Sequence, residues 1–218
     1  VRLKIEETPA FRAATDHEPP ARVPFFQLMR EFPGAILAAC AGAIVCYAVF
    51  YMATAFALAE ATGRLGYDRA SFLSIQLFSN LFLIIGVLCA ALLADRTSPG
   101  KTMIWGSLVI VILGFAYGPA LATGSLAIAT ILLCGLLFVM AFTNGPLSTW
   151  TASLFPVKLR YSGVAFSMNL GGIVGGGMTP LAAQAMSAAG WGQYNGLLMS
   201  VAAVLTIFGV AMSRPLEE

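Results

Sequence analysis

Four long stretches of the chain contain no charged residue, and together they cover most of its 218 residues. These stretches are residues 32–59, 70–94, 102–157 and 161–213. A helix needs about 20 apolar residues to cross the hydrocarbon core of a bilayer. Each of the two shorter stretches is long enough for one crossing, and each of the two longer ones is long enough for two. Because only 10% of the residues are charged, against about 25% in soluble domains, the sequence predicts a membrane protein.

The two longest stretches each contain a turn signal near the middle, "GPALATGS" at 118–125 and "GWGQYNG" at 190–196. Residues 1–31 are expected to form a polar segment that ends in a short interfacial helix, and residues 214–218 a polar tail. The chain begins at Val1 in a charged segment, as expected of a fragment of a longer protein. The predicted fold is an all-α membrane protein with a six-helix transmembrane bundle over 32–213, whose helices lie at about 33–59, 70–94, 103–121, 125–154, 161–187 and 194–212.

Basic residues are divided unequally between the two sides of this predicted bundle. Six crossings place both termini on one side, and only Arg64 and Arg69 lie on the other. The positive-inside rule then predicts that both termini are cytoplasmic. The net charge of +2 reflects this bias, so nucleic acid is not an expected partner and the lipid bilayer is. The basic residues on the predicted cytoplasmic side are Arg2, Lys4, Arg12, Arg22, Arg30, Arg96, Lys101, Lys158, Arg160 and Arg214.

Groups suited to catalysis or metal binding do not occur inside the predicted spans. The single histidine, His17, lies in the polar segment before them, and the four cysteines have no metal or redox spacing. Intramembrane hydrolases need a nucleophile with a base, or a metal site. The sequence therefore predicts no enzyme, no cofactor and no metal. A proton relay normally uses an intramembrane ionisable group, and these predicted spans supply none.

Uncharged polar side chains are concentrated on the second, fourth and fifth predicted helices, whereas the third and sixth have few and are expected to face lipid. An amide in hydrocarbon needs a hydrogen-bonding partner or water. The clustered pattern favours an aqueous pathway, while bonds that only hold the bundle together explain any single amide equally well. Core packing is likewise the alternative for each tyrosine. The candidate substrate-binding residues are Tyr47, Tyr51, Gln76, Asn80, Asn144 and Asn169.

The segment "SMNLGGIVGGGMTP" at 167–180 collects glycines that weaken a helix in water. In lipid, small residues instead let two helix backbones approach closely. Glycines recur every four residues there, which predicts one smooth stripe and a second beside it. Proline removes a backbone donor, so a bend is expected near each of two prolines. Static packing and bending around a substrate both fit this pattern, whose residues are Gly163, Gly171, Gly172, Gly175, Gly176, Pro180 and Pro146.

Three segments resemble motifs of the major facilitator superfamily, in its metabolite:proton symporter branch. "LLADRTSPGK" at 92–101 resembles the loop signature G-x-L-x-D-R-x-G-R-[KR], with Asp95 and Arg96 on its acidic-basic pair and Ser98-Pro99 in place of Gly-Arg. "LFPVKLRYSG" at 154–163 resembles the E-L-F-P-T-x-x-R-x-x-G segment, with Ser153 in place of the glutamate and Val157 in place of the threonine. "RLKIEETPAF" at 2–11 resembles the end of that branch's central cytoplasmic loop.

This resemblance implies the C-terminal six-helix half of a secondary active transporter in the bacterial inner membrane. Such a protein moves a small organic metabolite, an organic acid or osmolyte, by alternating access, with the proton as coupling ion. The N-terminal six-helix half would be the partner and would supply the coupling group, while Asp95, Arg96 and Arg160 would act in gating. An uncoupled facilitator is one alternative; a six-helix scaffold or homodimeric porter is another if the chain is complete. The substrate, the direction of transport and the oligomeric state do not follow from the sequence.

Overall fold

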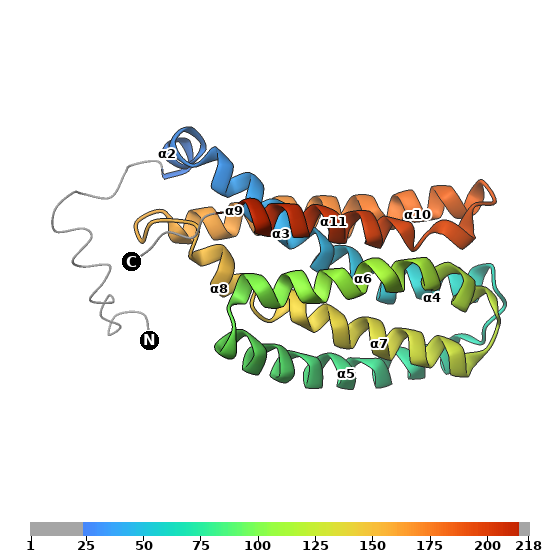
Figure 1. The fold of residues 1–218 in the computed structure, drawn as a ribbon. Coiled ribbons are helices and arrows are strands. Elements are labelled where there is room, and N and C mark those ends of the chain that lie inside the picture. Colours follow the sequence, from blue (N-terminus) through green and yellow to red (C-terminus); the bar gives the residue numbers. More distant parts are fainter. Residues whose placement is uncertain (1–23, 214–218) are drawn as a thin grey trace, which may run out of the picture.

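The structure is a computed structural model that describes residues 24–213, and the predictions for residues 1–23 and 214–218 lie outside it. Helices joined by short connections make up these described residues, in which no strand occurs. Figure 1 shows the long helices running side by side, so that their ends gather at two opposite ends of the bundle. The α-helices are α2 (Pro24–Glu31), α3 (Pro33–Tyr51), α4 (Ala57–Gly63), α5 (Arg69–Arg96), α6 (Pro99–Ala122), α7 (Leu126–Asn144), α8 (Leu147–Ala152), α9 (Arg160–Gly172), α10 (Thr179–Ala188) and α11 (Leu197–Met212).

Five helical runs in the described part of the chain are long and apolar enough to cross a membrane. They are Pro33–Gly63, Arg69–Arg96, Pro99–Ala122, Leu126–Ala152 and Gly192–Met212. The fifth predicted helix, at 161–187, is also helical as α9 and α10, but it is not among these five. Its glycines, Asn169, Pro180 and Gln184 make it more polar than the others. The prediction of an all-helical membrane protein is therefore confirmed, while the number of six crossings stays a prediction.

In residues 24–213, π-helical turns, which contain one more residue than an α-helical turn, occur at two places. Met52–Phe56 joins α3 to α4, and Ile173–Met178 joins α9 to α10. The second π turn ends directly before Thr179 and Pro180, where a bend was expected. Between α7 and α8 the helix is interrupted at Gly145 and Pro146. Such departures from regular helix often occur at functional sites.

Three helices in the described part of the chain begin with a capping side chain, which is Asp68, Ser98 or Ser125. The Asp68 carboxylate accepts a hydrogen bond from the backbone N–H of Ser71, 2.8 Å away, which holds the pKa of that carboxyl below its usual range. Ser98 caps α6 in the same way through the N–H of Lys101, and Pro99 occupies the first helical position. The predicted start of this helix at 103 is therefore too late, because it was placed after the charge of Lys101.

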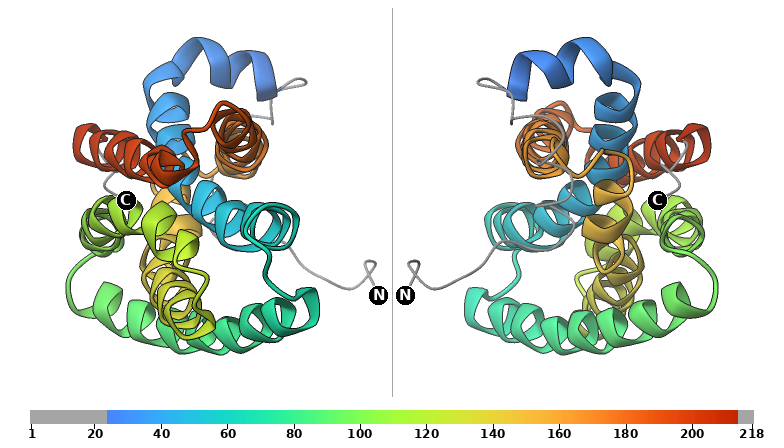
Figure 2. Two further views of the ribbon diagram at one scale, coloured as in Figure 1. Left: turned by 90° about the vertical axis from the view of Figure 1, so that its right-hand side faces the viewer. Right: turned by 90° about the vertical axis from the view of Figure 1, so that its left-hand side faces the viewer.

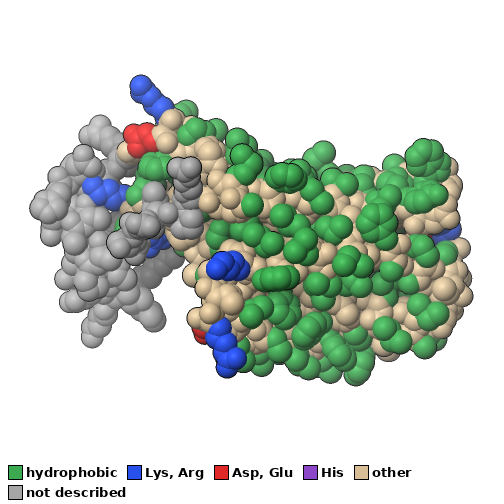
Figure 3. All heavy atoms as spheres, in the orientation of Figure 1, with side chains coloured by type: hydrophobic (Ala, Val, Ile, Leu, Met, Phe, Trp, Pro, Cys, Tyr) green, Lys and Arg blue, Asp and Glu red, His purple; other side chains and the backbone are tan. Residues whose placement is uncertain are grey.

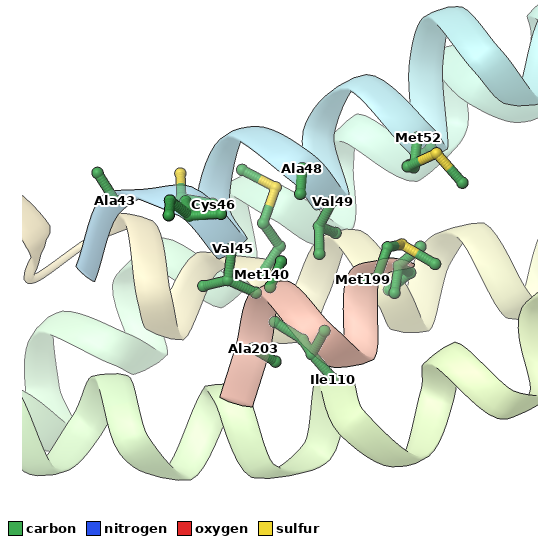
Figure 4. Close-up of a cluster of buried hydrophobic side chains, with 14 of the residues drawn as sticks. Ala43, Val45, Cys46, Ala48, Val49, Met52, Ile110, Met140, Met199 and Ala203 are labelled. Carbon is green, nitrogen blue, oxygen red and sulfur yellow. The ribbon is translucent and has the colours of Figure 1, made fainter. Parts of the chain in front are cut away.

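Helix α3 is the centre of the bundle and contacts α7, α9 and α11. Seen along the bundle in Figure 2, α11 and α9 lie on either side of α3, and α5 lies farther away, beyond α7. Figure 4 shows the apolar core that forms where α3, α6, α7 and α11 meet, with Val49, Ile110, Met140 and Met199 among its side chains. Thr206 on α11 adds a polar contact by donating to the Ala41 carbonyl over 2.7 Å. Because α7 and α11 pack against other sides of α3, the side of α3 that faces α9 is determined by this packing.

Hydrophobic side chains also cover most of the outer surface. Figure 3 shows them along the length of the face drawn, with the charged side chains near its ends. An apolar surface of this kind suits a hydrocarbon solvent. The least buried of the five candidate spans is α5, of which 17% is buried, against 39% for α6 and 44% for the span that ends in α11. Gln76 and Ser79 of α5 are buried, while its leucines Leu77, Leu88 and Leu92 are exposed. That the third and sixth helices face lipid stays a prediction.

Candidate functional site

An open groove of about 420 Å³ runs along the bundle where α3 faces α9 and the π turn that follows it. Three of the six predicted substrate-binding residues, Tyr47, Tyr51 and Asn169, line this groove. Glycine backbone forms much of the opposite wall. The groove is lined by Tyr47, Tyr51, Met168, Asn169, Gly172, Ile173, Gly176 and Gly177.

Glycines on α9 and its π turn let this wall approach α3 closely. A Cβ added at Gly171 would lie 2.7 Å from the Ala43 Cβ and 2.9 Å from the Cys40 carbonyl oxygen. A Cβ added at Gly175 would collide with the Ile44 carbonyl oxygen. Both distances are below ordinary van der Waals contact, so no larger residue fits. The first glycine stripe therefore lies against the backbone of α3.

The second glycine stripe lies under the two tyrosine rings. A Cβ added at Gly172 would be 3.6 Å from the ring of Tyr47, and one added at Gly176 would be 2.7 Å from the ring of Tyr51. Each tyrosine is thus paired with a glycine, and both pairs repeat at a spacing of four residues. These ring-on-backbone contacts determine where the two phenol groups lie in the groove.

The polar atoms of the groove are available for a ligand. Neither the Tyr47 nor the Tyr51 hydroxyl has a hydrogen-bond partner among residues 24–213, and Tyr51 is 41% exposed. Asn169 is exposed, and its amide nitrogen donates to the Ala165 carbonyl over 2.7 Å, while its amide oxygen has no hydrogen-bond partner among residues 24–213. Two phenols and an amide offer hydrogen-bond donors and acceptors without a net charge. Such a set suits the hydroxyl and carboxylate groups of a small polar molecule.

Asn144, at the end of α7, lies outside the groove but close to α3. Its amide oxygen accepts a hydrogen bond from the Cys46 thiol, with 3.3 Å between the oxygen and the sulfur. Asn144 is exposed, and Cys46 precedes the groove residue Tyr47 in the chain. The structure thus places Asn144 beside α3, the helix that contains Tyr47 and Tyr51, and not in the groove wall.

Gln76 and Asn80, on α5, are bonded to backbone carbonyls. The Gln76 amide nitrogen donates to the carbonyls of Ala53 and Thr54, over 2.9 and 2.7 Å. Asn80 donates to the Gln76 carbonyl over 2.8 Å. The structure therefore separates the six candidates into three places, because the sequence showed which residues share one helix face but not which helices are neighbours.

The residues predicted to act in gating lie at one end of the bundle. Asp95 and Arg96 end α5, are exposed, and form no ion pair within the described part of the chain. Arg160 begins α9, and its Nε donates to the Phe155 carbonyl over 3.4 Å. Gly163 follows in the same helix, where an added Cβ would lie 2.6 Å from the Phe155 ring. These contacts give the Arg160 segment a defined position at this end.

A buried polar network at the opposite end of the bundle was not expected from the sequence. The Glu60 side chain is only 10% exposed, and its Oε1 accepts from Arg64 Nε over 2.7 Å and from the Ser187 hydroxyl over 2.9 Å. Asn195, which is 1% exposed, donates to Ser187 over 2.7 Å. The network connects α4, α10 and the turn before α11. The predicted first span ended at Ala59, whereas the helix continues to Gly63 and so includes Glu60.

One signal for this network is present in the sequence, and the rest is not. Glu60 and Arg64 are four residues apart, a spacing at which opposite charges pair on a helix. Ser187 and Asn195 lie far from this pair in the sequence, and Ser187 is 127 residues from Glu60. In residues 24–213 no three His, Cys, Asp or Glu side chains gather as a metal site would require.

Comparison with known proteins gives relatives of one kind. The chain is 28% identical over 221 residues to the inner membrane metabolite transport protein YhjE of Escherichia coli, covering 98% of the chain and 50% of that protein. It is 30% identical over 192 residues to the shikimate transporter of E. coli, covering 85% of the chain and 43% of that protein. A putative metabolite transport protein of Haemophilus influenzae is 28% identical over 96% of the chain and 49% of its own length.

No family model matches the chain. The chain spans about half the length of the curated relatives it matches. The relatives are transport proteins, and the five apolar helical runs of residues 24–213 are long enough to cross a membrane. The chain is therefore homologous to bacterial metabolite transport proteins, and its resemblance to the transporters of the major facilitator superfamily is confirmed.

Proposed function

We propose that this chain is the C-terminal part of a secondary active transporter that carries a small organic metabolite across the bacterial inner membrane by alternating access. The groove between α3 and α9 is the surface that it contributes to the substrate site. The observation that carries this proposal is the groove itself, in which two unpaired tyrosine hydroxyls and the Asn169 amide lie against glycine backbone. In transporters of this kind the substrate lies between two repeats near the middle of the bilayer.

The chemistry of the groove favours a substrate with hydroxyl and carboxylate groups. Phenol and amide groups bind such a molecule through hydrogen bonds, and a cation for the carboxylate would come from the N-terminal half. One relative of the chain is a shikimate transporter, and a hydroxylated cyclic carboxylate of that class fits the donors and acceptors present. Zwitterionic osmolytes and dicarboxylates are the other classes to be compared.

The first test is uptake by the full-length protein in proteoliposomes, with a panel of labelled organic acids and osmolytes. Asn169→Leu is expected to reduce uptake about tenfold or more, because a hydrogen bond to a charged group contributes roughly 1.5–3 kcal/mol. Gln184→Leu is the matched control, since Gln184 is exposed on α10 and lies outside the groove. If both variants and the unaltered protein show equal uptake, Asn169 does not bind the substrate.

Coupling to protons is a separate prediction. Uptake against a substrate gradient is expected to require an inward proton gradient and to stop when an uncoupler dissipates it. Glu60 and Arg64 are already paired with each other, so we place the coupling group in the N-terminal half. Uptake that continues unchanged with the uncoupler would make the protein an uncoupled facilitator. Uptake by the 218-residue chain alone would instead support a homodimeric porter.

We further propose that Asp95, Arg96 and Arg160 act at the cytoplasmic gate, with both ends of the chain in the cytoplasm. Asp95 and Arg96 are exposed at the end of α5, where the carboxylate can meet the positive N-terminal end of a neighbouring helix. The exposed basic residues Arg30, Arg96 and Lys101 lie at this same end of the bundle. Together they support the cytoplasmic orientation.

A further inference from the structure

The π turn at Met52–Phe56 begins directly after Tyr51, at the edge of the groove. In this turn the N–H of Ala57 bonds to the Met52 carbonyl, five residues back. An extra residue in one turn rotates the helix that follows by about 100° relative to the helix before it. The π turn therefore determines how the segment with the groove tyrosines is oriented relative to α4.

Side chains from two other helices donate to three consecutive carbonyls of this π turn. The Tyr117 hydroxyl, on α6, donates to the Met52 carbonyl over 2.6 Å. Gln76, on α5, uses its amide nitrogen for the carbonyls of Ala53 and Thr54. Tyr117 is fully buried and Gln76 is 9% exposed. The carbonyls of Met52 and Thr54 also accept from the Ala57 N–H, so the two side chains add further donors to this turn. In an apolar interior, a lost hydrogen bond to a carbonyl is costly.

The helices before and after the π turn, α3 and α4, each have packing contacts that do not involve the turn. On one side, α3 packs closely against Gly171 of α9 and Gly175 of the π turn that follows it. On the other side, Glu60 fixes α4 to α10 through Ser187. If the π turn relaxed to a regular α-helical turn, one of these segments would have to rotate by about 100°. Tyr51 is the last residue of α3 before the turn, so its ring would move away from Gly176 when α3 is the segment that rotates.

We infer that Gln76 and Tyr117 are positioning residues for the substrate groove: they hold the three carbonyls of the Met52–Phe56 π turn and so fix Tyr51 over Gly176. With both amide hydrogens of Gln76 donated to the backbone, that amide does not bind the substrate through its N–H groups. This inference rests on the proposed function of the groove. It assigns to Gln76 a role different from the direct binding expected from its place on a polar helix face.

The test uses the full-length protein in liposomes, in a cysteine-free background with one added thiol. Gly177→Cys supplies this thiol, because Gly177 lines the groove, is exposed, and a Cβ there would meet nothing within 4 Å. The labelling rate with an aqueous maleimide is measured with Gln76→Met, which keeps the length of the side chain without its donor, and with Tyr117→Phe, which removes one oxygen. The matched controls are Gln184→Met and Tyr194→Phe, whose side chains are exposed outside the groove.

Tyr117→Phe is expected to change the labelling rate about fivefold, the effect of losing roughly one net hydrogen bond, and Gln76→Met, which loses two, is expected to change it more. The same variants are expected to raise the KM for uptake by a similar factor while the maximal rate and the amount in the membrane stay unchanged. The double variant is expected to show less than the sum of the two single effects, because both side chains hold the same turn. The two control variants are expected to match the unaltered protein.

The possible outcomes separate this inference from the function on which it rests. Unchanged labelling in both Gln76→Met and Tyr117→Phe overturns the inference. A KM that responds only to Gln76→Met, with unchanged labelling, also overturns it and makes Gln76 a direct ligand. Changed labelling with an unchanged KM supports the positioning role but removes the groove from the substrate site. If Gln76→Met does not fold, Tyr117→Phe alone decides, since it keeps the shape of the side chain.

Discussion

Replacing Gly175 with leucine is expected to push α3 away from the π turn after α9 and to lower the melting temperature of the bundle strongly. Even a Cβ at this position would collide with the Ile44 carbonyl oxygen and lie 3.0 Å from the Ala48 backbone nitrogen. The atoms in the way belong to the backbone and cannot rotate aside. Overpacking of an interior costs about 1–3 kcal/mol, and a clash with backbone belongs at the upper end of that range.

The measurement is the melting temperature and the monodisperse fraction of the full-length protein in detergent. Gly135→Leu is the matched control, because Gly135 is also a helical glycine but a Cβ there meets nothing within 4 Å. Gly175→Ala is expected to fall between the two. If Gly175→Leu and Gly135→Leu melt at the same temperature, the glycine stripe does not lie at a helix interface.

Replacing Glu60 with leucine is expected to loosen the end of the bundle where α4, α10 and the turn before α11 meet. The substitution leaves the buried Ser187 hydroxyl and the Arg64 guanidinium without their common acceptor. Removing one partner of a buried hydrogen bond costs about 1–3 kcal/mol. The contribution of Arg64 is at the lower end, because this side chain is 48% exposed and water screens its charge. A melting temperature lowered by several degrees is the expected result.

Glu31→Leu provides the control for this substitution. Glu31 also pairs with a residue four positions away, Gln27, but both are on the surface of α2. Exposed pairs of this kind contribute little. A double-variant cycle of Glu60→Leu with Ser187→Ala should show that the two effects are not additive. Strict additivity, or equal melting of the Glu60 and Glu31 variants, would mean that the network does not join these helices.

The sequence predicted the helices well because the physics involved is local. Charge-free stretches, turn signals and the length needed to cross a bilayer act within a few tens of residues. The five candidate spans accordingly begin and end within a few residues of the predicted helices, apart from the start of α6 at the Ser98 cap. The end of the first helix was missed for a related reason. The charged residue Glu60 was taken as the boundary of the helix, although in the fold Glu60 forms an ion pair with Arg64 and the helix continues past it.

The candidate site was only partly predictable, because its parts come from different helices. Tyr47, Tyr51 and Asn169 meet in the groove, but no spacing in the sequence reveals that α3 lies against α9. Gln76 was chosen for the same reason as Asn169, as an amide on a polar helix. Its bonds to Ala53 and Thr54 depend on the π turn of a different helix.

The sequence by itself determined that this chain folds as apolar helices in a bilayer, since the cost of burying charge in hydrocarbon depends only on composition and order along the chain. Its motifs also determined the family to which it is similar. Only the tertiary structure decided which polar side chains face an open groove and which satisfy backbone carbonyls. The physical reason is that hydrogen bonds act over about 3 Å, so the role of an amide is decided by the helix packed beside it.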